Sequence, residues 1–172
     1  MTHRLGAQTI EHQGKESPVL LKEIYEKGHY AFVDGPFTWQ EAIRESVKPL
    51  TTDGTADAIY AEEIIACVEK HGPYIVLMPG VAMPHSTENA KGTHATAISF
   101  MHTSEPVHFD EGDPDKDATV FFTLCDTDPD AHLANMQRLV AVLTNEEAVA
   151  RLKEATCPED LLEIDAMLAD AE

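Results

Sequence analysis

His85 stands at the end of a short segment that two prolines stiffen. The preceding run, residues 74–78, is apolar and β-rich, which predicts a strand buried on both faces. Pro79 and Gly80 then turn the chain, and Pro84 comes directly before the histidine, so we expect the ring to be rigidly held and reached by solvent. Because a neutral imidazole nitrogen is a competent nucleophile and positioning lowers the barrier of group transfer, His85 is a candidate nucleophile for group transfer. The alternative is an ordinary surface histidine after a proline turn.

A second histidine, His132, lies in the first turn of a predicted helix. Asp128 is the expected N-cap, and Pro129 occupies the first helical position. His132 shares its apolar stripe with residues at steps of three and four: Met136, Leu139, Val140 and Leu143. A histidine on such a stripe is more often a partly buried structural residue than a catalyst. A helix N-terminus nevertheless suits a phosphoryl group, so His132 and His85 would form an anion site if they lie opposite each other.

Other chemistries find little support in the sequence. The chain has nine histidines, but none shows the HxxxH or HxH spacing joined to acidic or cysteine ligands that zinc usually needs. A histidine-rich metal-binding domain remains an alternative, and we expect neither a metal nor a cofactor. The pattern G-x-S-x-G and the phosphate-binding glycine motifs are absent. Cys67, Cys125 and Cys157 are widely spaced and are predicted to be core residues in a reducing compartment.

The composition limits the classes of partner. Among 172 residues there are 12 basic and 31 acidic side chains, a formal net charge of −19. Such a charge repels nucleic acid and anionic lipid, so we expect neither as a partner. The N-terminal residues lack the apolar core of a secretory signal, and the apolar fraction of 43% is typical of a globular domain. These features predict a cytoplasmic protein.

The elements that must position the two histidines follow from periodicity and capping signals. Three S/T-x-x-E capping boxes begin at Thr38, Thr144 and Thr156. We expect helices over residues 39–47, 58–70 and 129–143, two more ending near 152 and 168, and strands over 74–78, 93–101 and 118–124. Residues 1–17 are expected to form a flexible tail, and 18–28 a short helix or extended segment. This order of elements predicts one layered α/β or α+β domain.

Several of these motifs, taken in order, resemble the EIIA type-2 domain of the bacterial sugar phosphotransferase system (PTS). They are GPYIVLMPGVAMPH at residues 72–85, PVHFD at 106–110, DPDKDATVFF at 113–122 and DPDAHLANMQRLVAVLTNEE at 128–147. The form GPY-x-V-x-x-PG-x-AMPH is most similar to the ascorbate-specific branch, as is TWQEA at residues 38–42. The similarity extends from about Thr38 to the C-terminus.

The resemblance implies a single-domain α/β fold over residues 18–172, in which helices flank a mixed β-sheet and the two histidines face each other in a shallow depression. It implies a phosphocarrier in which His85 accepts a phosphoryl group from phospho-HPr and passes it to a cysteine of the cognate EIIB. His132 would stabilise that group. The membrane EIIC would be engaged only indirectly, and the best guess for the sugar is L-ascorbate. A nitrogen-type regulatory phosphoprotein that acts by partner binding is an alternative. A homodimer is also an alternative, because the apolar Met78 and Met83 could belong either to the core or to an interface.

One departure from the family concerns the phosphate site. Ascorbate-type members often carry a small residue followed by Arg-Pro-Glu after the histidine, whereas this chain has Ser86, Thr87 and Glu88. The mannitol branch places an arginine before the preceding strand, where Lys70 could act as a point charge. We expect His132 and the backbone N–H groups around residues 84–86 to supply the donors for the phosphoryl group.

Overall fold

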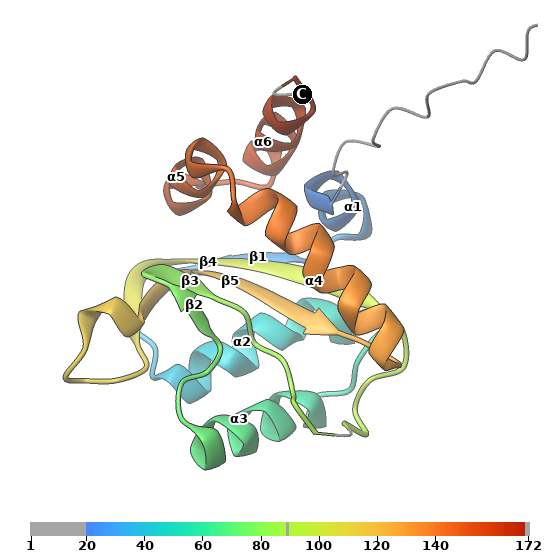
Figure 1. Cartoon of the computed structure of the whole chain (residues 1–172), viewed down its shortest axis with the longest axis vertical. Coiled ribbons are helices and arrows are strands. Elements are labelled where there is room, and N and C mark those ends of the chain that lie inside the picture. Colours follow the sequence, from blue (N-terminus) through green and yellow to red (C-terminus); the bar gives the residue numbers. More distant parts are fainter. Residues whose placement is uncertain (1–19, 89, 171–172) are drawn as a thin grey trace, which may run out of the picture.

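The protein is described by a computed structural model that places residues 20–88 and 90–170 (Figure 1). The predicted tail, residues 1–17, lies outside these described residues. A five-stranded sheet forms the middle layer, in the order β1-β4-β5-β3-β2. Its strands are β1 (Tyr30–Val33), β2 (Val76–Met78), β3 (Gly80–Ala82), β4 (Ala97–His108) and β5 (Asp117–Cys125).

The sheet is mixed. β1 runs parallel to β4 and β3 runs parallel to β5, whereas β4 and β5 are antiparallel, as are β2 and β3. The parallel pairing of β3 with β5 matters for function, because the carboxyl ends of two neighbouring parallel strands lie side by side at one edge of the sheet.

Helices cover both faces of the sheet, as Figure 1 shows. One face carries α2 (Trp39–Thr51) and α3 (Ile59–His71), and the other carries α1 (Leu20–Lys27), α4 (Pro129–Leu143), α5 (Glu146–Glu154) and α6 (Glu159–Asp170). A short 3₁₀ helix, η1 (Pro114–Lys116), precedes β5. The predicted α/β fold, a mixed sheet flanked by helices, is confirmed. In the described ranges no helix is both long and apolar enough to cross a membrane.

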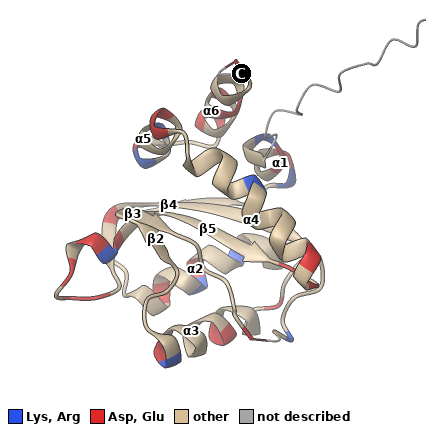
Figure 2. Ribbon diagram, in the orientation of Figure 1, with Lys and Arg blue, Asp and Glu red and all other residues tan. Residues whose placement is uncertain are grey.

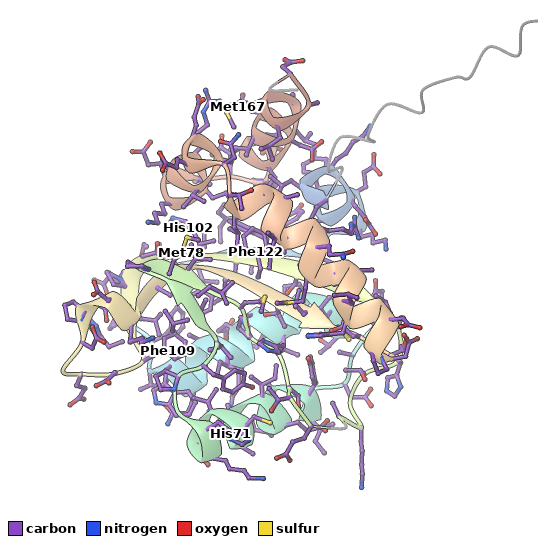
Figure 3. All side chains as sticks on the ribbon, in the orientation of Figure 1. His71, Met78, His102, Phe109, Phe122 and Met167 are labelled. Atoms are coloured by element: carbon purple, nitrogen blue, oxygen red, sulfur yellow. The ribbon has the colours of Figure 1, made fainter. Side chains whose placement is uncertain are left out.

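Two hydrophobic cores hold these layers together. Phe121 on β5 packs with the core under α2 and α3, and its neighbour Phe122 packs with the core under α1 and α4–α6. Successive side chains of a strand point to opposite faces, so the central strand β5 is apolar on both sides. Figure 3 shows the same division, with Phe109 on the α2–α3 side and Phe122 on the α4 side. Met83, at 2% exposure, belongs to the second core, and Met78 packs against it.

Local signals set several helix ends as predicted. The Thr38 hydroxyl accepts a hydrogen bond from the Glu41 N–H, and the Glu41 carboxylate accepts one from the Thr38 N–H, which completes the capping box of α2. α2 continues to Thr51, past the predicted end at residue 47. Gly72 ends α3 with a φ of +80°, a conformation that favours glycine.

The prediction for residues 74–78 is wrong in one respect. This run contains the edge strand β2, in which Leu77 is 42% exposed, and not a strand buried on both faces. The physical reason is a tight reversal at Gly80, whose φ of +92° lets residues 80–82 turn back as β3 and take the place beside β5. The sequence pattern predicted no strand at β3 or at β1.

Other boundaries also differ from the prediction. β4 begins at Ala97 and continues to His108, later at both ends than the predicted 93–101. Thr144 does not begin α5, because its N–H still bonds to α4 carbonyls; the cap is Asn145, whose side chain accepts from the Ala148 N–H. At α6 the predicted capping box paired Thr156 with Glu159. In the structure the Thr156 N–H donates instead to the carboxylate of Asp160.

Candidate functional site

His85 lies just past the carboxyl end of β3, in a segment held from two sides. The Met83 N–H donates to the Ile75 carbonyl at 2.7 Å, and the Leu124 N–H of β5 donates to the Pro84 carbonyl at 3.0 Å. These backbone hydrogen bonds join the segment to residue 75 on one side and to strand β5 on the other. His85 is therefore presented by a fixed backbone, as its proline-rich surroundings predicted.

The ring of His85 is also fixed. Its Nδ1 lies 2.7 Å from the Met83 carbonyl oxygen, which can only accept a hydrogen bond, so Nδ1 carries the proton and Nε2 keeps a lone pair. The ring of Tyr74 meets the imidazole edge to face, with centroids 5.2 Å apart, and the Tyr74 hydroxyl donates to the His85 carbonyl. The nitrogen left for chemistry is Nε2.

The ionisation of His85 is set mainly by burial. Desolvation lowers the pKa of His85 from its ordinary value, and the nearby His132 lowers it further. The Met83 carbonyl and the Asp126 carboxylate act in the opposite direction without reversing the shift. At neutral pH the ring is therefore uncharged, which is the nucleophilic form.

His132 reaches the same place from the next strand. β5 ends at Cys125, and α4 begins at Pro129 after Asp128, whose carboxylate accepts from the Ala131 N–H at 2.8 Å. His132 lies in the first turn of this helix. The His85 and His132 ring centroids are 5.6 Å apart and the ring planes are inclined by 34°. The parallel ends of β3 and β5 thus bring the two predicted histidines together.

Asp126 and Asn135 complete the surroundings of His132. The Asp126 Oδ2 lies 2.6 Å from the His132 Nδ1, and the Asn135 side-chain NH₂ donates to the other oxygen of the same carboxylate. Asn135 is only 2% exposed, and the Asp126 side chain is 11% exposed. Sequence reasoning missed Asp126, Asn135 and Tyr74. Only the position of Asp126, two residues past the predicted strand 118–124, could have indicated it.

The two histidines line an open depression of about 490 Å³. Its other lining residues are Tyr60, Ser86, Thr87, Glu88, Ala90, Thr93, Asp126, Thr127, Asp128 and Pro129. Neither lysine nor arginine is among the described residues of this lining, and three of its side chains are carboxylates. The described ranges contain no group of three or more His, Cys, Asp or Glu side chains that could hold a metal ion.

The segment after His85 is bound to the end of α3. The Ser86 hydroxyl lies 3.4 Å from the Cys67 sulfur and accepts from the Glu88 N–H at 3.2 Å. Lys70 lies 2.7 Å from the Glu88 carboxylate, so the point charge considered from the sequence is engaged by an acid and does not line the depression. Cys67 and Cys125 are buried, as predicted, and Cys157 is half-buried.

Known proteins resemble this chain in both sequence and fold. The family described as "Phosphoenolpyruvate-dependent sugar phosphotransferase system, EIIA 2" matches residues 29–165. The ascorbate-specific PTS system EIIA components of Shigella boydii serotype 4 and Escherichia coli K12 are each 29% identical over 128 residues, which cover 74% of this chain and 82% of the relative.

Two solved structures show the same architecture. A putative PTS IIA domain from Streptococcus pyogenes M1 GAS is 33% identical, with a TM-score of 0.76 over 88% of this chain and 96% of its own. A complex of enzyme IIAMTL and phosphorylated enzyme IIBMTL from Escherichia coli gives a TM-score of 0.69 at 25% identity, over 80% of this chain and 94% of its own.

Proposed function

Because the chain belongs to the EIIA 2 family of the phosphoenolpyruvate-dependent sugar phosphotransferase system, we propose that it is a phosphocarrier with His85 as its phosphoryl acceptor. The observation that carries this proposal is the pair of rings 5.6 Å apart, with His85 fixed through Nδ1 and its Nε2 free. A nucleophile held in this way has little freedom to lose when the donor docks.

The transfer proceeds through one nitrogen. The lone pair of the His85 Nε2 forms a bond to phosphorus while the N–P bond of phospho-HPr breaks and its electron pair returns to the HPr nitrogen. The proton stays on the His85 Nδ1, which donates to the Met83 carbonyl. In the second step a cysteine thiolate of EIIB attacks phosphorus, the S–P bond forms, and the electron pair of the N–P bond returns to Nε2. His85 is then ready for another cycle.

His132 stabilises the phosphoryl group in this proposal. A phosphoryl group on His85 adds negative charge to a depression whose described lining contains carboxylates and neither lysine nor arginine. A protonated His132 has donors on both ring nitrogens, one for Asp126 and one for a phosphoryl oxygen. The backbone N–H groups of His85 and Ser86 are the further donors proposed for the phosphoryl oxygens, whereas the Ser86 hydroxyl donates to the Glu88 carbonyl.

The relatives support the proposed partner and the proposed substrate. The structural neighbour solved with phosphorylated enzyme IIBMTL supports an EIIB protein as the acceptor. Relatives named ascorbate-specific support L-ascorbate as the sugar whose uptake the system serves. The chain would act in the cytoplasm and meet the membrane EIIC only through EIIB.

Labelling with radioactive phosphate tests the proposal. Phosphoenolpyruvate, enzyme I and HPr should label the wild-type chain, His85→Ala should take no label, and His132→Ala should be labelled but should pass its phosphate to EIIB slowly. His108→Ala is the matched control, because His108 is exposed and lies at the opposite end of the sheet. Undiminished label on His85→Ala would refute the assignment. Labelling without any transfer to an EIIB would favour a regulatory phosphoprotein.

A further inference from the structure

Among the described residues, the Asp126 side chain is less exposed to solvent than any other carboxylate that pairs with a histidine. The side chains of the other carboxylates within 4 Å of a histidine nitrogen are more exposed: 47% for Asp53, 57% for Asp57, 55% for Glu88 and 23% for Asp117. The Asp126 side chain is 11% exposed. Its second oxygen receives a bond from Asn135, a buried amide on the same helix as His132. This network is therefore a shielded structure and not an exposed surface ion pair.

The hydrogen bonds of Asp126 determine which ring nitrogen of His132 carries the proton and how the ring is oriented. A carboxylate has no proton to donate, so the His132 Nδ1 must be the protonated nitrogen, and Nε2 is left free. Asn135 occupies the other carboxylate oxygen, which prevents the carboxylate from rotating away from the ring. Asp126 thus selects both the tautomer and the orientation of His132.

We propose that Asp126 is a positioning residue for phosphoryl transfer, which holds His132 through Nδ1 so that Nε2 serves the phosphoryl group on His85. This inference rests on the proposed function and deepens it. Asp126 also offsets the positive charge of His132 when that ring is protonated, at a site where the described lining has no lysine or arginine. Fixing a catalytic imidazole through a carboxylate on its second nitrogen is a general device of enzymes.

Two substitutions separate this role from a structural one. Asp126→Asn keeps the shape but replaces one acceptor oxygen with an NH₂ donor, so the bonds to Asn135 and to the His132 Nδ1–H cannot both survive. Asp126→Ala removes both bonds. Asp117→Asn is the matched control: it alters another carboxylate bonded to a histidine Nδ1, at the far end of β5.

The first measurement needs no phosphoryl donor. Nitrogen-15 NMR of the histidine rings, at a pH where His132 is neutral, should show the Nδ1–H tautomer in the wild-type chain and a raised share of the Nε2–H tautomer in both Asp126 variants. The control should leave His132 unchanged. A wild-type His132 that is mainly the Nε2–H tautomer would overturn the proposal.

The second measurement is the rate of phosphoryl transfer to EIIB. Both Asp126 variants should lose about tenfold or more in the rate at saturating EIIB, with little change in KM, because Asp126 acts through His132 and not on the partner. Rates within twofold of wild type in both variants, with His85 still labelled, would overturn the role of Asp126 alone. A wild-type chain that takes no label on His85 would overturn the proposed function itself.

Discussion

At the scale of single residues, the protonation of His85 is the property that decides its reactivity. Burial and the neighbouring His132 lower its pKa, so protonation is disfavoured in the folded chain. We expect the ring to titrate below the ordinary histidine value of about 6.5. An NMR titration of the His85 ring protons measures this directly. A midpoint at or above that value would contradict the account.

Residue types and local order revealed the two histidines, but not the side chains that support them. His85 and His132 stand in recognisable settings, a proline-stiffened corner and a capped helix start. Asp126 and Tyr74 act through contacts that only the folded chain creates: Tyr74 reaches the His85 carbonyl across the β2–β3 turn, and Asp126 is held by Asn135. Such partners have no periodic signal in the sequence.

At the scale of elements, the site depends on β3, a strand of three residues that begins at Gly80. Gly80→Ala should strain the backbone, because φ is +92° there and the new methyl group would lie 2.6 Å from the Lys153 side chain. We expect a loss of about 1–2 kcal/mol in the free energy of unfolding, measured with urea, and slower acceptance of phosphate by His85.

Gly54→Ala is the control for that substitution. Gly54 also has a positive φ, +78°, but no atom lies within 4 Å of the added methyl group, and the residue lies outside the β3 segment. It should lose stability through the backbone alone and keep the wild-type rate of phosphate acceptance. Equal loss of acceptance in both variants would contradict a specific role for β3.

A second element-scale prediction concerns Asp53, which joins the end of α2 to the start of β1. Its carboxylate accepts from the Thr55 hydroxyl and lies 2.7 Å from the buried His29. The Thr55 hydroxyl and then His29 lower the pKa of Asp53 to about 2, against the effect of burial. Folding thus favours the ionised form, so its stabilising effect is complete above the unfolded pKa, about 3.9, and is lost as pH falls towards 2.

Asp53→Asn tests this pH window. The difference in unfolding free energy between wild type and variant, measured with urea, should be largest between pH 5 and pH 7. It should shrink between pH 4 and pH 3. A difference that does not change with pH would show that the Asp53 charge does not stabilise the fold.

The elements were predictable where one signal dominated. The capped helices α2 and α4 and the apolar strand β5 follow from periodicity and caps. The short strands β1 and β3, of four and three residues, did not, because each is stabilised by its parallel neighbour and not by its own sequence pattern. The caps of α5 and α6 were misassigned because several neighbouring side chains could cap each helix.

At the scale of the whole molecule, the net charge of −19 lowers the stability of the folded state. Figure 2 shows acidic residues on the helices and loops of both layers, with far fewer basic ones. Self-repulsion destabilises such a compact chain, and salt screens it, since the Debye length falls from about 10 Å at 0.1 M to about 3 Å at 1 M. We expect Tm to rise between 0.05 M and 1 M NaCl, as measured by circular dichroism, while an equal osmolality of an uncharged solute has a smaller effect. A constant or falling Tm would contradict this.

The central claim is that the Nε2 of His85 carries the phosphoryl group. Nitrogen-15 and phosphorus-31 NMR of the chain phosphorylated through HPr tests it most directly, because coupling to phosphorus identifies the bonded nitrogen. We predict phosphorus on Nε2 of His85, with the Nδ1 proton still donated to the Met83 carbonyl. Phosphorus on Nδ1 of His85, or on His132 or any other side chain, would contradict it.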